Sequence, residues 1–187
     1  YDKGANGDKY DKNKFYYQVY PFELDSLNQI NTELLQLDGQ LVSGGIFEPI
    51  KSGLKLQNDK AYGIDVNTGA KGYNLFGNKG KYIADLKLDG NGLSGKGLFE
   101  FGPAKLYADT SFFFMDSVYA DLDSVRITED KVANMPQTRI NQSSFVWNVK
   151  RDSLTISEGK DENFSMYNNT TDFNGKLILH NKNLYGV

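Results

Sequence analysis

The stretch KYIADLKLDGNGLSGKGLFE, residues 81–100, decides the fold. Its first half alternates apolar and charged side chains, and the apolar positions are Tyr82, Ala84, Leu86 and Leu88. A period of two places successive side chains on opposite faces, which is typical of a β-strand with one buried face. The sequence Asp-Gly-Asn-Gly follows at residues 89–92, and these residue types allow a tight reversal of the chain. The stretch therefore predicts a strand that ends in a turn.

The same alternation recurs elsewhere in the chain. Phe15, Tyr17 and Val19 share one face of a segment that Pro21 ends, and further alternating positions are Phe145, Trp147 and Val149. Turn residues separate these runs at 38–39, 44–45, 67–69, 77–80, 102–103 and 174–175. Many short strands with frequent turns predict an all-β fold. Residues 24–35 alone have a helical spacing, which predicts either one to three helical turns or no helix.

The composition excludes several classes of protein. The 187 residues include 21 basic and 24 acidic side chains, one His and no Cys. Without Cys there is no disulfide, no thiolate zinc site and no cysteine nucleophile, and one His excludes sites that need two imidazoles. The net charge of −3 argues against a nucleic-acid partner. No apolar run approaches the roughly 20 residues of a transmembrane helix, so we predict no transmembrane segment.

Two halves of the chain resemble each other. Residues 73–95 align without a gap on residues 164–186, with Leu86 matching Leu177 and Leu93 matching Leu184 at a constant offset of 91. We therefore expect two β repeat units, residues 1–93 with an N-terminal extension and residues 94–187, either separate or parts of one continuous domain. They would be a piece of a longer tandem array. The alternative is two β-meanders that are alike only in composition.

The order of the strands stays open at this stage. A repetitive architecture of short strands fits a β-solenoid, a β-taco or jelly-roll-like fold, or alternatively a β-sandwich.

A family resemblance rests on motifs spread over most of the chain. They are residues 14–17, 20–22, 24–27, 37–39, 43–47, 92–97, Trp147, Arg151 with Asp152, and 164–167. Together they resemble a stretch of the very large, repetitive, functionally uncharacterised exported proteins of Bacteroidetes. A looser likeness is to the β-taco repeats of AsmA-like envelope proteins. The resemblance implies an exported location, periplasmic or at the cell surface, and brings no catalytic residues.

Exposed aromatic side chains are the first candidate site. Tyr16, Tyr17, Tyr20 and Trp147 could supply stacking platforms for sugars. The alternation of Trp147 with Phe145 and Val149 favours the core instead. The apolar run at residues 112–115 fits either a central strand covered on both faces or one wall of a lipid-binding groove.

Two further kinds of site follow from short motifs. Asn6, Asp8, Asp11 and Asn13 offer oxygen ligands for a structural cation, although the neighbouring lysines dilute the charge. No cofactor is implied. Asp-Ser followed by an aliphatic residue occurs at Ser26, Ser117, Ser124 and Ser153. If the resemblance holds, these serines match a short bacterial O-glycosylation sequence, whereas serines at turn-to-strand junctions explain the motif equally well.

Catalytic side chains are scarce. The only imidazole, His180, lies in a predicted turn, and carboxylate pairs such as Asp85 with Asp89, Asp121 with Asp123, and Asp161 with Glu162 read as solvated strand faces or turns. We therefore expect no enzyme. The favoured function is a structural or adhesion segment of a large exported envelope protein, with neighbouring repeats of the same chain as partners. A module that binds cell-surface carbohydrate or lipid is the alternative, and a polysaccharide-degrading enzyme is the third hypothesis.

Overall fold

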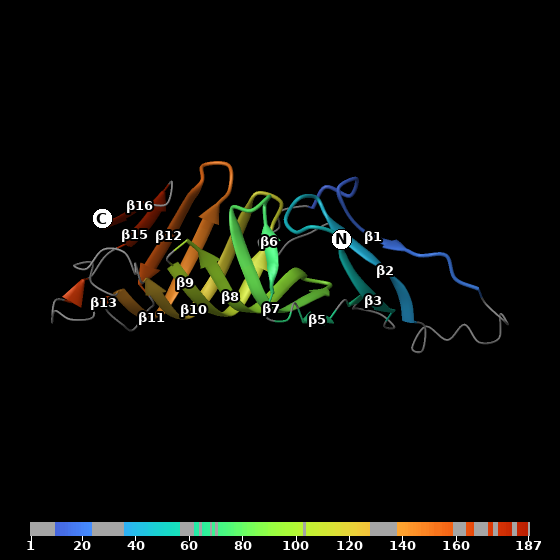
Figure 1. The fold of residues 1–187 in the computed structure, drawn as a ribbon, viewed down its shortest axis with the longest axis horizontal. Helices are drawn as coiled ribbons and strands as arrows, with labels where there is room; N and C mark the ends of the chain where they lie inside the picture. Colours follow the sequence, from blue (N-terminus) through green and yellow to red (C-terminus); the bar gives the residue numbers. More distant parts are fainter. Residues whose placement is uncertain are drawn as a thin grey trace.

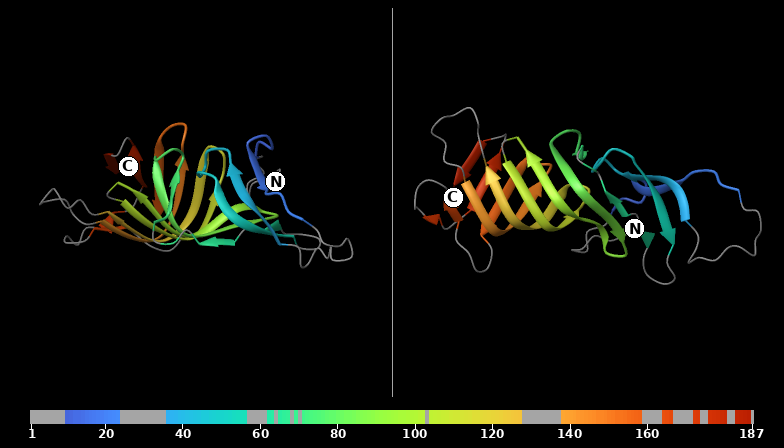
Figure 2. Two further views of the ribbon diagram at one scale, coloured as in Figure 1. Left: turned by 45° about the vertical axis from the view of Figure 1, so that its right-hand side comes forward. Right: turned by 60° about the horizontal axis from the view of Figure 1, so that its bottom comes forward.

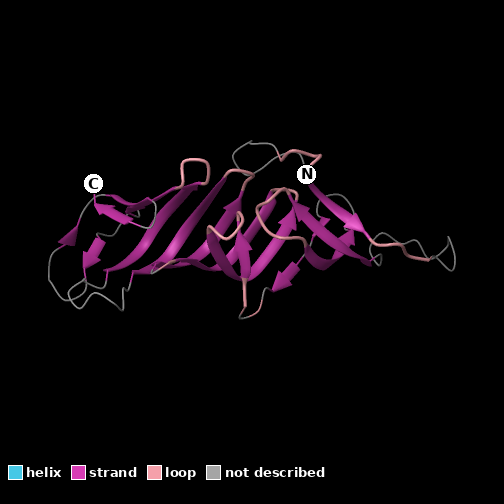
Figure 3. Ribbon diagram, turned by 45° about the horizontal axis from the view of Figure 1, so that its top comes forward, coloured by secondary structure: helices cyan, strands magenta, loops and turns pink. Residues whose placement is uncertain are grey.

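The structure is a computed structural model, and every regular element that it describes is a β-strand (Figure 3). It describes residues 10–23, 36–56, 62–63, 65–67, 69, 71–102, 104–127, 138–158, 164–166, 172–173, 176–180 and 183–186. The predicted all-β class is confirmed. The helix considered for residues 24–35 lies outside the described residues. Within the described ranges no helix could cross a bilayer.

The strands form two antiparallel sheets. The smaller one has the order β1 (Phe15–Val19), β2 (Gln36–Ser43), β3 (Ile50–Leu56) and β4 (Tyr62–Gly63). The larger, twelve-stranded sheet has the order β16-β15-β12-β11-β10-β9-β8-β7-β5, with β6, β13 and β14 beside this path. Its strands are β5 (Asp65–Asn67), β6 (Tyr73–Leu75), β7 (Gly80–Asp89), β8 (Gly92–Phe101), β9 (Ala104–Phe113), β10 (Ser117–Ile127), β11 (Thr138–Asn148), β12 (Ser153–Glu158), β13 (Phe164–Met166), β14 (Asp172–Phe173), β15 (Lys176–His180) and β16 (Asn183–Gly186).

The molecule is elongated, because the strands lie side by side along its long axis (Figure 1). The larger sheet curls into a trough, with the smaller sheet at one end and β15 and β16 at the other (Figure 2). All described strand pairs are antiparallel. Parallel coils of a solenoid would need parallel neighbours, so the curled sheet fits the taco-like or sandwich alternatives.

The two faces of the larger sheet differ sharply. We call the face that carries the buried side chains the inner face and the opposite one the outer face. The inner face holds a line of aromatic rings: Phe47, Phe113, Phe99, Phe145, Phe101, Trp147 and Phe76, with successive ring centroids 4.8–6.4 Å apart. These rings come from loops and from strands β8, β9 and β11. The core therefore ties together strands that are far apart in the sequence.

Glycines in β8 make room for an aromatic ring from the neighbouring strand. The hydroxyl of Tyr82 donates a hydrogen bond to the carbonyl oxygen of Asp85 at 2.7 Å. A Cβ added at Gly95 would lie 2.3 Å from that hydroxyl oxygen, and one at Gly97 would lie 3.1 Å from it. Only glycine fits beneath the ring, which explains the Gly-x-Gly spacing in the middle of a strand.

A similar close approach corrects one predicted turn. Residues 38–39 lie inside β2 and do not reverse the chain. A Cβ at Gly39 would lie 2.7 Å from Cε1 of Tyr17, whose hydroxyl reaches across β2 to donate to the carbonyl oxygens of Leu37 and Ser52. The glycine in this Asp-Gly pair therefore serves packing. The predicted turns at 44–45, 89–92 and 102 do lie between strands.

The N-terminal segment packs against the inner face. The hydroxyl of Tyr10 donates to the carbonyl oxygen of Phe113 and accepts from the backbone N–H of Leu93 at 3.1 Å. Its ring stacks on Phe15 with centroids 4.1 Å apart. Burial, partly offset by the Leu93 hydrogen bond, raises the pKa of Tyr10 to about 12. This residue fixes the start of the described chain to the middle of the larger sheet.

The boundary expected between residues 93 and 94 falls inside β8, which pairs with β7 on one edge and β9 on the other. The two expected units therefore share one continuous sheet.

Candidate functional site

Four adjacent strands interrupt their alternation at one level of the larger sheet. Ala84 has a φ of 125°, which a residue with a Cβ rarely adopts. Its cross-strand partner is Gly97, and Gly97 pairs in turn with Ala108. The register shifts between Gly95 and Gly97 on β8 and on both sides of Leu122 on β10. Such bulges bend the sheet and turn extra side chains toward one face.

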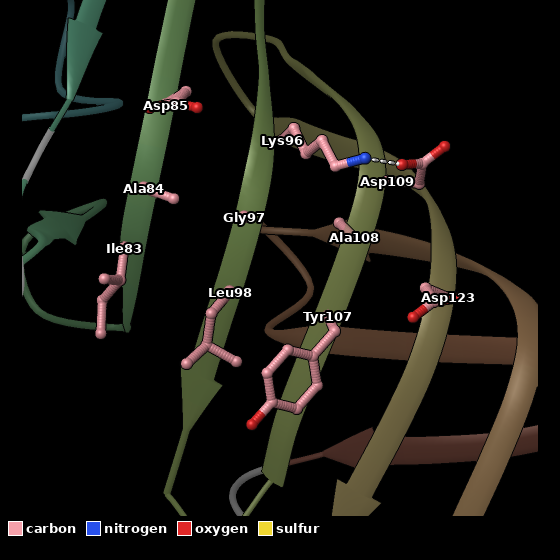
Figure 4. A pocket seen from close by; sticks show the side chains of 10 residues that line it. All are labelled: Ile83, Ala84, Asp85, Lys96, Gly97, Leu98, Tyr107, Ala108, Asp109 and Asp123. Carbon is pink, nitrogen blue, oxygen red and sulfur yellow. Dashed lines mark hydrogen bonds and ion pairs between the residues drawn. The ribbon is translucent and has the colours of Figure 1, made fainter.

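These irregularities form an open groove on the outer face with a volume of about 670 Å³ (Figure 4). Its lining consists of Ile83, Ala84, Asp85, Lys96, Gly97, Leu98, Tyr107, Ala108, Asp109 and Asp123. These side chains come from four neighbouring strands, β7 to β10. The groove thus lies on the opposite side of the sheet from the aromatic core.

One side of the groove is charged. Lys96 forms an ion pair with Asp109, and both side chains are largely exposed to solvent. The hydrogen bond and charge of Asp109 raise the pKa of Lys96, and the charge of Asp123 adds to this. With Asp85, three carboxylates face a single ammonium group in the lining. The groove therefore has a net negative charge.

The other side of the groove is apolar. Ile83, Leu98 and Tyr107 are successive cross-strand neighbours, and each is half-buried. The guanidinium carbon of Arg126 lies 5.7 Å from the centroid of the Tyr107 ring, within the range of a cation–π contact. An aromatic and aliphatic strip beside carboxylates and an ammonium group can stack on the apolar face of a sugar ring and hydrogen-bond to its hydroxyls.

The predicted aromatic residues occupy three different environments. Tyr16 is 45% exposed, Tyr20 is half-buried, and Tyr17 is half-buried over Gly39. Burial, and secondarily the charges of Asp38 and Tyr20, raises the pKa of Tyr17. Trp147 is only 3% exposed and packs edge-on against Phe101, so the core reading of its alternation fits and its ring cannot serve as a stacking platform.

The predicted cation ligands are only partly described. Asn6 and Asp8 lie outside the described residues. Asp11 accepts a hydrogen bond from the backbone N–H of Asn13 at 3.0 Å and lies 3.7 Å from the ammonium group of Lys14. In the part of the chain that is described, no cluster of three or more acidic or histidine side chains could hold a metal ion.

The four serines of the O-glycosylation motif also differ. Ser26 lies outside the described residues. Ser117 is 8% exposed, so an attached sugar would require its side chain to leave the interior. Ser153 is half-buried at the start of β12. Ser124 is half-buried and pairs directly with Tyr107, which places it beside the groove.

The other chemical candidates do not meet at the groove. His180 ends β15 and pairs with Asn183 at a turn. Asp89 accepts a hydrogen bond from the backbone N–H of Asn91 in its turn. Phe113 and Phe114 are buried, which favours the central-strand reading of residues 112–115 over a lipid-binding wall. Asp161 and Glu162 lie outside the described residues.

Sequence reasoning did not single out Leu98, Tyr107 or Lys96. A signal for the groove was nevertheless present. The buried positions of β9 are spaced by two, except for a spacing of three between Ala108 and Ser111, and those of β10 have the same spacing of three between Leu122 and Val125. A change of parity within a strand indicates a bulge, and bulges often re-aim side chains near functional sites.

Comparisons with known proteins gave no match to a family model, to a curated protein or to a solved structure.

Proposed function

We propose that the chain is a non-catalytic structural segment of a large exported bacterial envelope protein, where it works as an elongated scaffold and adhesion module. The observation that supports this most is the form of the larger sheet. Strands β7 to β12 follow one another side by side in chain order, and the sheet runs through both halves of the sequence. Such a sheet carries its core along its whole length and extends by adding strands.

The inner face argues for a structural role. It is filled by large side chains such as Tyr82, Phe99 and Phe113, which are fully buried. A catalytic centre on this face would have to displace that packing. On the outer face, Asp109 is already bound to Lys96. The envelope location rests on the sequence resemblance.

Immunolabelling of the source bacterium tests the location. Antibodies raised against the purified chain should label intact cells, or should label cells only after the outer membrane is permeabilised. A cytosolic marker protein treated in the same way serves as the control. Recovery of the chain solely with the cytosolic marker would contradict the proposal.

The groove supports a second candidate function, carbohydrate binding, which would give the scaffold its adhesive property. Tyr107 with Leu98 and Ile83 forms the apolar strip, and the carboxylates beside it can accept hydrogen bonds from sugar hydroxyls. Because the groove is negatively charged, we expect it to take neutral or amino-bearing sugars in preference to acidic polysaccharides.

A glycan array with matched tyrosine variants tests this second function. Tyr107→Ala should abolish binding, because it removes the only aromatic ring among the lining residues. Tyr16→Ala removes an exposed tyrosine outside the groove and should leave binding unchanged. A blank array, or equal losses in the two variants, would count against the groove. Binding to phospholipid vesicles in place of glycans would support the lipid alternative.

A further inference from the structure

The pairing of the strands recurs along the chain at a fixed distance in sequence. Leu88 pairs with Leu93, and Leu179, 91 residues further on, pairs with Leu184. Six further pairs recur with the same offset on both partners: Leu86 with Gly95 and Leu177 with Gly186, Lys87 with Ser94 and Ile178 with Tyr185, Asp89 with Gly92 and His180 with Asn183, Tyr73 with Tyr82 and Phe164 with Phe173, Asn74 with Lys81 and Ser165 with Asp172, and Phe47 with Leu75 and Thr138 with Met166.

The recurrence reaches beyond neighbouring hairpins. Phe47 and Leu75 form an isolated bridge between segments that are not adjacent in the chain, and its counterpart joins β11 to β13. The pairing of β5 with β7 also has a counterpart, in which Val66 with Leu86 corresponds to Ile156 with Leu177 after a shift of one residue in β12. Two meanders of similar composition would share turns, but they would not share bridges of this kind in one register.

This correspondence makes β16 the counterpart of β8. The edge of β8 that faces away from β7 pairs with β9, where Leu93 lies opposite Phe113 and Gly95 lies opposite Ser111. Among the described strands, β16 pairs only with β15. The edge of β16 that faces away from β15 is therefore the equivalent of an edge that is covered within the same molecule.

We propose that this edge of β16 is a pairing site for a β9-type strand from a further unit of the same repeat. The strand runs antiparallel to β16, with the position of Phe113 opposite Leu184 and that of Ser111 opposite Gly186. The assignment rests on the proposed scaffold function and specifies how successive units join. It differs from general edge-to-edge aggregation because only one register is allowed.

The chemistry of the incoming strand follows from β9. Its inner face carries Leu106, Ala108 and Phe113, which are buried, and its outer face carries charged residues such as Lys105 and Asp109. Backbone hydrogen bonds supply pairing along any exposed edge, whereas the alternation of side chains fixes the register. A shift by one residue would turn the apolar face of the incoming strand toward solvent.

An extended chain tests the proposal. A second copy of residues 97–127 is joined directly after Val187, because Val187 stands 91 residues beyond Lys96. The copied β9 can then fold back onto β16 in the predicted register. The control omits the copied Gly97, which shifts the register by one residue and leaves the composition almost unchanged.

Hydrogen exchange of the amides at residues 183–186 is the readout. We expect exchange to slow by about tenfold or more in the extended chain and to stay unchanged in the shifted control. Unchanged exchange in the extended chain, equal slowing in both chains, or loss of protection in β8–β10 would overturn the proposal.

A cross-link provides a second readout, because the chain has no Cys. Tyr185→Cys together with Cys at the copied Phe112 should form a disulfide, since Ser94 lies opposite Phe112 in β8 and β9. The same pair in the shifted control should not, and cross-linking in both chains would refute the register. Failure here leaves the envelope location untouched, because immunolabelling tests that separately.

Discussion

Truncation of Phe99 is the most informative perturbation of the core. Its ring is fully buried and lies 4.9 Å from that of Tyr82, 5.1 Å from Phe145, 5.8 Å from Phe113 and 6.1 Å from Phe101, measured between centroids. Phe99→Ala removes contacts with rings from strands β7, β8, β9 and β11. Phe-to-Ala substitutions in close-packed cores cost about 3–5 kcal/mol. This is a large part of the roughly 5–15 kcal/mol that stabilises a typical domain.

Urea unfolding followed by fluorescence measures this cost, because the single Trp, Trp147, is buried beside Phe101. With an m-value of about 2 kcal/mol per molar urea, we expect the midpoint of Phe99→Ala to fall by about 2 M. Val146→Ala is the matched control, since Val146 is 39% exposed on the outer face and should change the free energy of unfolding by less than about 0.5 kcal/mol. Similar midpoints for the two variants would refute the assignment of the inner face as the core.

Three other predictions test different parts of the structure. The free energy of unfolding should fall as pH rises from 10 to about 12, because burial raises the pKa of Tyr10 to about 12 and folding favours its neutral form; Tyr10→Phe should flatten urea midpoints measured over this range. Gly95→Ala should cost about 1–3 kcal/mol in urea unfolding, and Tyr82→Phe in the same chain should recover part of the loss if the hydroxyl is the obstacle. Lys96→Ala should leave the melting temperature nearly unchanged, because its ion pair with Asp109 is solvated, yet it should alter binding in the glycan assay.

Hydrophobic alternation predicted the fold class and much of the core. Tyr82, Leu86 and Leu88 share the inner face as their spacing indicates, and Trp147 lies with Phe145 in the core. Alternation was less informative at β1, where Phe15 is buried but Val19 is 36% exposed. A period of two gives the side of a strand on which a residue lies. It does not say whether that side is covered at the end of a sheet.

The groove could not be read from the same pattern, because it depends on departures from regular pairing. Ala84 was expected on the face of Tyr82, yet its positive φ breaks the alternation and Ala84 lines the outer groove. Asp109 and Asp123 are placed by register shifts that arise only when three strands pair together. The neighbours of Tyr107 are likewise set by pairing over long distances in sequence.

Small-angle scattering of the isolated chain tests the central claim, a single continuous sheet that forms an elongated scaffold, most directly. A compact chain of 187 residues would have a radius of gyration of about 16 Å and a symmetric distribution of interatomic distances. We expect a larger radius and a distribution skewed toward long distances, as the arrangement of strands along the long axis requires (Figure 1). A symmetric distribution with a radius near 16 Å would contradict the scaffold.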